Sequence, residues 1–170
     1  MLIPDVNILV YAYDMDSPRH KLARAWWQAT LNQPRPVGMP WATSLGFIRI
    51  ATNRRILANP LSVHDAVGRV RKWLDHPRVR IVSPGERHAE ILFRLLTELG
   101  TAGNLTSDAH LAALAIEYQA ELVSTDADFS RFPGLRWFNP LAVRHLNPPT
   151  ASSVKTFATA PQKTSRIRRT

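Results

Sequence analysis

Cysteine is absent from this chain of 170 residues, and so are long uncharged apolar runs. The absence of cysteine excludes disulfide scaffolds, thiol catalysis and zinc held by cysteine, and it fits a reducing compartment. No apolar run approaches the roughly 20 residues that a membrane-spanning helix needs. Residues 1–14 carry acids within their apolar stretch and no basic segment, unlike a signal peptide. We therefore expect a cytoplasmic protein with no membrane partner.

Several motifs that mark familiar enzymes are also missing. The sequence has no Gly-x-Gly-x-x-Gly or Walker loop for nucleotides and no Gly-x-Ser-x-Gly elbow for a nucleophilic serine. A phosphatase of the haloacid dehalogenase type would carry an acid two positions after Asp5, where this chain has Asn7. The six histidines form no metal-binding pair on a helix, and most stand beside Arg or Pro in segments expected at the surface. These chemistries are therefore disfavoured.

Acidic residues are outnumbered, because 22 Lys and Arg face 13 Asp and Glu, which gives a net charge of +9. A basic excess favours a polyanionic partner, most simply a nucleic acid. Hydrophobic residues make up 45% of the chain, as in ordinary globular proteins. We predict one domain over residues 1–145. The remainder, 146–170, is rich in Pro, Ser, Thr and Ala, carries bases without acids, and is expected to be a disordered basic tail.

Hydrophobic patterning predicts strands that alternate with helices along the domain. Strands are expected near residues 1–5, 37–39, 79–82, 121–125 and 135–138, and helices near 17–31, 41–52, 62–74, 83–99 and 107–118. Ser17-Pro18, Ser62 and Ser83-Pro84 are the expected helix starts. Alternation of this kind indicates an α/β fold of three layers, in which helices cover both faces of a mostly parallel sheet.

Acidic residues follow two of the predicted strands. Asp5 ends the first strand, Asp126 and Asp128 follow the strand at 121–125, and Asp108 lies in the first turn of the helix before it. The carboxyl ends of parallel strands share one edge, where α/β proteins bind ligands. Clustered carboxylates repel one another unless they share a cation, and hard oxygen ligands favour Mg²⁺ or Mn²⁺. Such an ion next to a basic surface suggests hydrolysis of a phosphodiester.

Each acid also has a purely structural interpretation. Asp108 stands where a carboxylate stabilises the start of a helix. Asp126 and Asp128 are typical of a turn in which the side chain accepts a backbone hydrogen bond. Asp5 is harder to explain in this way, because an acid at the end of a buried strand pays a desolvation cost unless it has a partner. Function is therefore the favoured interpretation at Asp5, and both interpretations stay open for the other three.

Three segments together resemble the PIN-domain family, in the form of actinobacterial VapC toxins. They are Asp5-Val-Asn7-Ile-Leu, the run from Thr106 to Glu117 that contains Asp108, and Leu122-Val-Ser-Thr-Asp126-Ala-Asp128-Phe; Phe132–Leu141 closes the domain in a similar way. The resemblance covers about residues 1–145. It implies a Mg²⁺-dependent endoribonuclease, with Mn²⁺ as a substitute ion, that is the toxin of a type II toxin–antitoxin pair and is neutralised by a VapB-like antitoxin.

The resemblance also implies roles for individual residues. Asp5 and Asp108 would be the metal ligands, Asp126 would complete the acidic site, and Asp128 would be an auxiliary acid. We expect a homo-oligomer, because the apolar stripes of the first helices would bind the antitoxin or a second copy of the chain. An alternative is a degenerate PIN module that binds RNA or an antitoxin without cleaving.

Two supporting residues and one departure complete the comparison with the family. Asn7 would form hydrogen bonds around Asp5, and Thr125 would help to orient the site. PIN nucleases usually carry a glutamate on the second helix, where this chain has Ser44 or Gly46, and no acid occurs from residue 17 to 64. The site would therefore have one negative charge fewer. We expect one Mg²⁺ held by Asp5 and Asp108, with Asp126 near it, to suffice nonetheless.

Overall fold

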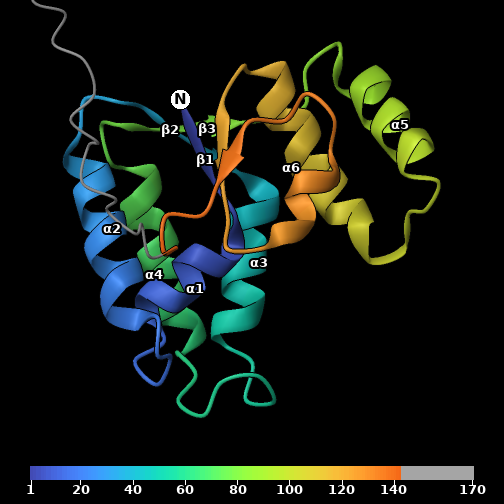
Figure 1. Ribbon diagram of the computed structural model, residues 1–170. Coiled ribbons are helices and arrows are strands. Elements are labelled where there is room, and N and C mark those ends of the chain that lie inside the picture. The colour runs from blue at the N-terminus through green and yellow to red at the C-terminus, as the bar shows by residue number, and fades with distance from the viewer. Residues whose placement is uncertain (143–170) are drawn as a thin grey trace, which may run out of the picture.

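The computed structural model describes residues 1–142, and the chain forms one parallel sheet of five strands within them (Figure 1). The strands are β1 (Leu2–Pro4), β2 (Val37–Pro40), β3 (Val79–Val82), β4 (Glu121–Val123) and β5 (Trp137–Phe138). Their order is β3-β2-β1-β4-β5, and every neighbouring pair is parallel. The predicted α/β class is confirmed. The expected basic tail, 146–170, lies outside the described residues.

Helices cover both faces of this sheet, as predicted. They are α1 (Val6–Tyr13), α2 (His20–Asn32), α3 (Trp41–Ala51), α4 (Val63–Leu74), α5 (His88–Leu99) and α6 (Thr106–Glu117), with short 3₁₀ helices η1 (Gly103–Leu105) and η2 (Ala127–Arg131). Figure 1 shows α1 to α4 on one side and α5 and α6 on the other. Each side has its own buried cluster of apolar side chains. In the described range, no helix is long and apolar enough to cross a membrane.

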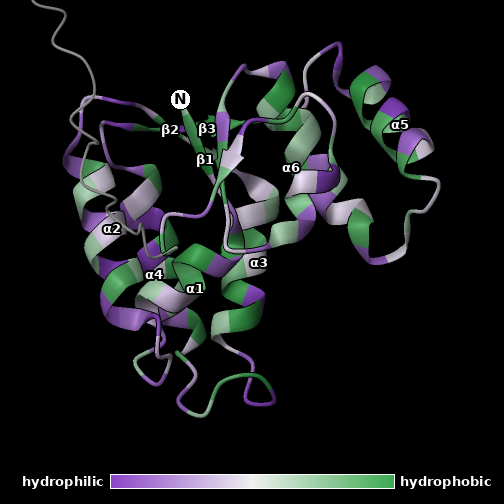
Figure 2. Cartoon of the chain, viewed as in Figure 1, coloured by the Kyte–Doolittle hydropathy of each residue, from purple (hydrophilic) through white to green (hydrophobic). Residues whose placement is uncertain are grey.

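Helix α1 is the element that the sequence patterning did not predict. Val6, Ile8 and Val10 are β-branched residues with strand propensity, yet the segment forms a helix whose Ile8, Leu9 and Val10 are buried. Figure 2 shows α1 in predominantly hydrophobic colours between the neighbouring helices. The side chain of Asp5 caps the helix by accepting a hydrogen bond from the backbone N–H of Val6 at 2.6 Å. Tertiary burial and this cap therefore outweigh local propensity.

The predicted helix starts are right at one position and early at two others. Ser62 caps α4 as expected, since its hydroxyl accepts a hydrogen bond from the N–H of Asp65 at 3.0 Å. Helix α2 begins at His20 and not at Ser17-Pro18, although the Ser17 hydroxyl accepts from the N–H of Arg19. Helix α5 begins at His88, because Glu117 on α6 binds the N–H groups of Gly85 and Arg87 and holds that segment as a turn.

The strand order creates a switch point beside β1. The chain moves outward from β1 to β2 and β3, and then returns to place β4 on the other side of β1. Pro4 pairs with Val123 in the register of these two strands. The residues that follow, Asp5 and Ser124, therefore emerge side by side at the carboxyl edge. In open α/β sheets, ligands bind in the crevice at such a point.

Candidate active site

Asp5 lies at the bottom of this crevice and is 6% exposed. Its backbone N–H donates to the carbonyl of Val123 at 2.8 Å, which fixes its position between β1 and β4. One carboxylate oxygen caps α1, and the other accepts a hydrogen bond from the hydroxyl of Ser124 at 2.8 Å. Burial raises the pKa of Asp5, and the hydrogen bonds from Ser124 and Val6 offset part of that rise.

Ser124 organises the residues around Asp5, and the sequence analysis did not identify it. While its hydroxyl donates to Asp5, the same oxygen accepts from Asn7 Nδ2 at 2.9 Å and from the N–H of Asp126 at 3.0 Å. Asn7 therefore supports Asp5 through Ser124 and forms no direct hydrogen bond with it in the structure. Thr125 contributes its backbone N–H, which approaches Asn7 Oδ1 at 3.5 Å. The signal for Ser124 was its place directly after the strand that pairs with β1.

Asp108 enters the same crevice from the first turn of α6. A pocket of about 480 Å³ is lined by Asp5 and Asp108, with hydroxyl and amide groups of Asn104, Thr106 and Ser107 on the α6 side. Burial, followed by the charges of Asp5, Asp126 and Asp128, raises the pKa of Asp108 to about 6. A carboxylate placed only to stabilise the start of a helix would have a lowered pKa. The surroundings of Asp108 therefore favour a functional interpretation of this residue.

Asp126 and Asp128 also serve the local structure. The Asp126 side chain accepts a hydrogen bond from the N–H of Asp128 at 2.9 Å and caps η2. The structural interpretation of Asp126 as a turn residue is thus confirmed, although its charge still acts on both Asp5 and Asp108. Asp128 is exposed and lies 3.7 Å from the guanidinium of Arg131. Neither Asp126 nor Asp128 lines the pocket that holds Asp5 and Asp108.

The face of α3 that meets the pocket carries no acid. The hydroxyl of Thr43 donates to the carbonyl of Pro4 at 3.0 Å, which fastens the start of α3 to the end of β1. Gly46 and Arg49 follow on the same face and line the pocket. Ser44 is 1% exposed and does not line the pocket. Gly46 therefore occupies the pocket-facing position at which the family's usual glutamate is expected.

The pocket fits a divalent cation through two carboxylates. Among residues 1–142, no group of three or more His, Cys, Asp or Glu side chains is close enough to hold a metal ion. The three-aspartate cluster that we expected around one cation is thus not assembled. Asp5 and Asp108 nevertheless share the pocket, and a cation would offset the unfavourable burial that raises the pKa of both. Because Mg²⁺ keeps several waters and takes one or two carboxylates, this donor set suits it.

The raised pKa of Asp108 predicts that the metal-free protein loses stability as pH rises. The carboxyl has a pKa of 3.8 without the fold and of about 6 within it, so the folded state binds more protons between these values. Stability should fall across this window and level off above it. Solvent screening at this partly exposed side chain limits the loss to about 1 kcal/mol. Metal-free thermal melts of wild type and Asp108→Asn would check this: a difference that stays constant across the window contradicts the prediction.

Comparison with known proteins gives the same picture. The PIN-domain family profile matches residues 2–135. Ribonuclease VapC33 of Mycobacterium tuberculosis is 48% identical over 141 residues, which cover 83% of this chain and 99% of that protein. Ribonuclease VapC37 of the same organism is 44% identical over 143 residues, or 84% of this chain and 99% of the relative.

Solved structures share the fold at much lower identity. VapBC2 from Rickettsia felis, bound to a DNA fragment from their promoter, matches with a TM-score of 0.61 at 18% identity and covers 81% of this chain and 97% of that one. Mycobacterium tuberculosis VapC20, described as a Sarcin-Ricin loop cleaving toxin, matches with a TM-score of 0.59 at 18% identity, over 80% and 99% of the two chains.

The sheet is all-parallel with acids at its switch point, and the family profile matches most of the chain. The chain therefore belongs to the PIN-domain family. The resemblance predicted from the sequence is confirmed. Within that family the chain belongs with the VapC ribonucleases, which it matches over nearly their whole length.

Proposed function

We propose that the chain is a Mg²⁺-dependent endoribonuclease that acts as the toxin of a VapBC-type pair. The observation that carries the proposal is the pocket at the switch point, which Asp5 and Asp108 both line and in which both have raised pKa values. The net charge of +9 suits a polyanionic substrate. The names of the curated relatives support RNA as that substrate.

The proposed roles follow from the positions of the side chains. Asp5 and Asp108 would hold Mg²⁺, or Mn²⁺ in its place, while Asp126 and Asp128 add negative charge beside them. When bound, the ion supplies positive charge for the phosphoryl oxygens and lowers the pKa of a water. Ser124 keeps the Asp5 carboxylate oriented toward the pocket. Arg49 on α3, which also lines the pocket, would bind an RNA phosphate.

Incubation of the purified full-length protein with structured RNA tests the proposal. We expect cleavage with Mg²⁺ that is lost with EDTA and lost in Asp5→Asn, together with Mg²⁺ binding by calorimetry that also disappears in this variant. Asp75→Asn is the matched control, because Asp75 is an exposed acid at the end of α4 and does not line the pocket. Cleavage that persists in EDTA or in Asp5→Asn would overturn the metal-dependent mechanism.

The alternative function has one observation in its favour. The absence of an acid at Gly46, together with the absence of a three-carboxylate cluster in the described residues, suits a PIN module that binds RNA or an antitoxin without cleaving. Wild-type protein that binds RNA but leaves it intact in Mg²⁺ and in Mn²⁺ would favour this alternative over the nuclease.

A VapB-like antitoxin is the protein partner that we propose, because the structural neighbours include VapBC assemblies. Action in the cytoplasm, where the RNA and the antitoxin would be met, belongs to the same proposal. The homo-oligomer that we expected from the apolar stripes stays a prediction.

A further inference from the structure

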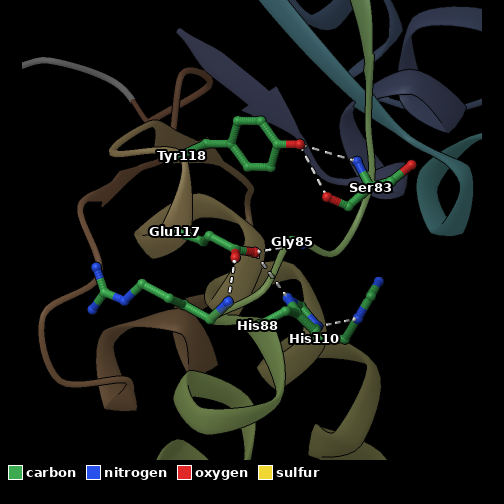
Figure 3. Close-up of polar contacts among 7 residues, drawn as sticks. Ser83, Gly85, His88, His110, Glu117 and Tyr118 are labelled. Carbon is green, nitrogen blue, oxygen red and sulfur yellow. Dashed lines mark hydrogen bonds and ion pairs between the residues drawn. The ribbon is translucent and has the colours of Figure 1, made fainter.

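Three side chains that the proposed mechanism does not use form a chain leading to the pocket (Figure 3). Glu117 Oε2 lies 3.6 Å from His88 Nδ1, and His88 Nε2 lies 3.0 Å from His110 Nδ1. Glu117 and His110 are seven residues apart on α6 and so share one face, while His88 reaches them from the start of α5. His110 lines the same pocket as Asp5 and Asp108.

This chain of side chains is held firmly at its far end. The Glu117 carboxylate accepts hydrogen bonds from the N–H groups of Gly85 at 3.1 Å and Arg87 at 3.0 Å. Glycine permits this close approach, since a Cβ at Gly85 would lie 2.7 Å from Glu117 Oε1. The side chains of His88 and Glu117 are only 8% and 12% exposed. Rotation of Glu117 would break two hydrogen bonds, and rotation of His88 would break its contact with His110.

The partners determine where the hydrogens lie when both rings are uncharged. His88 Nδ1 is buried and makes no hydrogen bond in the described part of the chain, and it lies 3.6 Å from the Glu117 carboxylate. The negative charge of that carboxylate favours a hydrogen on Nδ1 over a lone pair in the neutral ring. His88 Nε2 then accepts, and His110 Nδ1 donates to it. This leaves a lone pair on His110 Nε2. Within residues 1–142 His110 Nε2 has no hydrogen-bond partner. The atom is also not buried.

A lone pair on the pocket wall selects for a donor. Phosphate oxygens and the carboxylates of Asp5 and Asp108 only accept, so they do not match His110 Nε2. A hydroxyl group does match. In an RNA complex the hydroxyls available are the ribose 2′-OH, which distinguishes RNA from DNA, and water.

We propose that His110 contacts the substrate complex by accepting a hydrogen bond at Nε2 from a hydroxyl in the pocket, and that His88 and Glu117 are its positioning residues. This inference rests on the proposed nuclease function and adds a residue to the same site. Recognition of the substrate then depends on which ring nitrogen of His110 carries the hydrogen.

Two substitutions of His110 separate the two nitrogens. The amide nitrogen of His110→Asn replaces Nδ1 and keeps the hydrogen bond to His88, but nothing replaces Nε2. The longer side chain of His110→Gln places an amide oxygen near the position of Nε2. We expect kcat/KM for RNA cleavage to fall about tenfold in the Asn variant, the value of one hydrogen bond, with most of the loss restored in the Gln variant. Wild-type rates in both variants, or equal losses in both, would overturn the proposal.

The positioning residue is tested in the same assay. His88→Gln places an amide oxygen where Nε2 accepts from His110, whereas His88→Leu removes the acceptor. We expect the Leu variant to lower kcat/KM and the Gln variant to restore it. If both His88 variants lose cleavage activity only in proportion to a lowered melting temperature, His88 has a structural role and the proposal for it is contradicted.

Single 2′-deoxy nucleotides in the RNA, placed at the mapped cleavage site, identify the hydroxyl. If the donor is the ribose, the substitution slows wild type as much as His110→Asn does and slows that variant no further. If the donor is water, the 2′-deoxy substitution changes the cleavage rates of wild type and His110→Asn by the same factor.

A measurement that does not depend on cleavage keeps the inference separate from the proposed function. Ring ¹⁵N spectra of the full-length protein at about pH 8.5, well above the usual imidazole pKa of about 6.5, should show the His110 hydrogen on Nδ1. A hydrogen on Nε2 in a protein that cleaves RNA would overturn the inference alone. Absence of cleavage by wild type would overturn the proposed function instead.

Discussion

Asp108→Asn should abolish RNA cleavage and at the same time raise the melting temperature of the metal-free protein. The carboxylate is desolvated and is repelled by Asp5, Asp126 and Asp128, as its pKa of about 6 reflects. Asparagine has a similar shape and no charge, so the folded state loses this repulsion. Activity falls because a bound cation contributes several kcal/mol of charge stabilisation in the transition state, and about 4 kcal/mol corresponds to about 10³-fold in rate.

The opposite directions of these two effects make the prediction specific. A carboxylate whose purpose was to stabilise the start of α6 would lower the melting temperature when it is removed. Saturating Mg²⁺ should also stabilise the wild type, by about 2.7 kcal/mol at a concentration of 100 times its Kd, and leave the variant unchanged. Asp75→Asn is again the matched control, because Asp75 is an exposed acid at the end of α4 and does not line the pocket. Equal loss of activity in both variants, or destabilisation by Asp108→Asn, would contradict this interpretation.

The sequence was sufficient to predict the layers of the fold and the acids at its switch point. Alternation of short apolar runs with helical segments identifies βαβ units, and the rule that parallel strands end at one edge then brings Asp5 toward Asp126 without any coordinates. Helix α1 could not be predicted in this way, because Val6, Ile8 and Val10 have strand propensity and become helical only through burial and the Asp5 cap. Its signal was an acid directly before an apolar run.

The supporting residues were harder to predict because their roles depend on side-chain contacts between distant segments. Ser124 matters through the pairing of Pro4 with Val123, which one sequence does not reveal. His88 stands between Arg and Ala in the sequence, where we expected an exposed surface, yet it is 6% exposed beneath α6. Sequence spacing alone left open whether Ser44 or Gly46 stands at the position of the family's usual glutamate. The lining of the pocket favours Gly46.

Gly46→Glu should restore the missing charge and tighten Mg²⁺ binding about tenfold, an effect of about 1.4 kcal/mol. Gly46 lines the same pocket as Asp108, so a carboxylate there adds a hard oxygen ligand or a nearby negative charge. The same charge repels Asp5 and Asp108 when no metal is present. The variant should therefore melt at a lower temperature than wild type in EDTA and cleave RNA faster than wild type when Mg²⁺ is limiting.

Gly46→Ala separates this charge effect from the effect of adding a side chain. A Cβ at position 46 would lie 3.2 Å from Val6 Cγ2, so Val6 must shift by a few tenths of an ångström in either variant. Against that strain, alanine gains up to about 1 kcal/mol of helix propensity over glycine. Alanine brings no oxygen, so calorimetry should find its Mg²⁺ affinity equal to that of wild type. If the Ala and Glu variants bind Mg²⁺ equally well, the pocket-facing position on α3 does not contribute to the metal site, and the charge missing from this chain must be explained elsewhere.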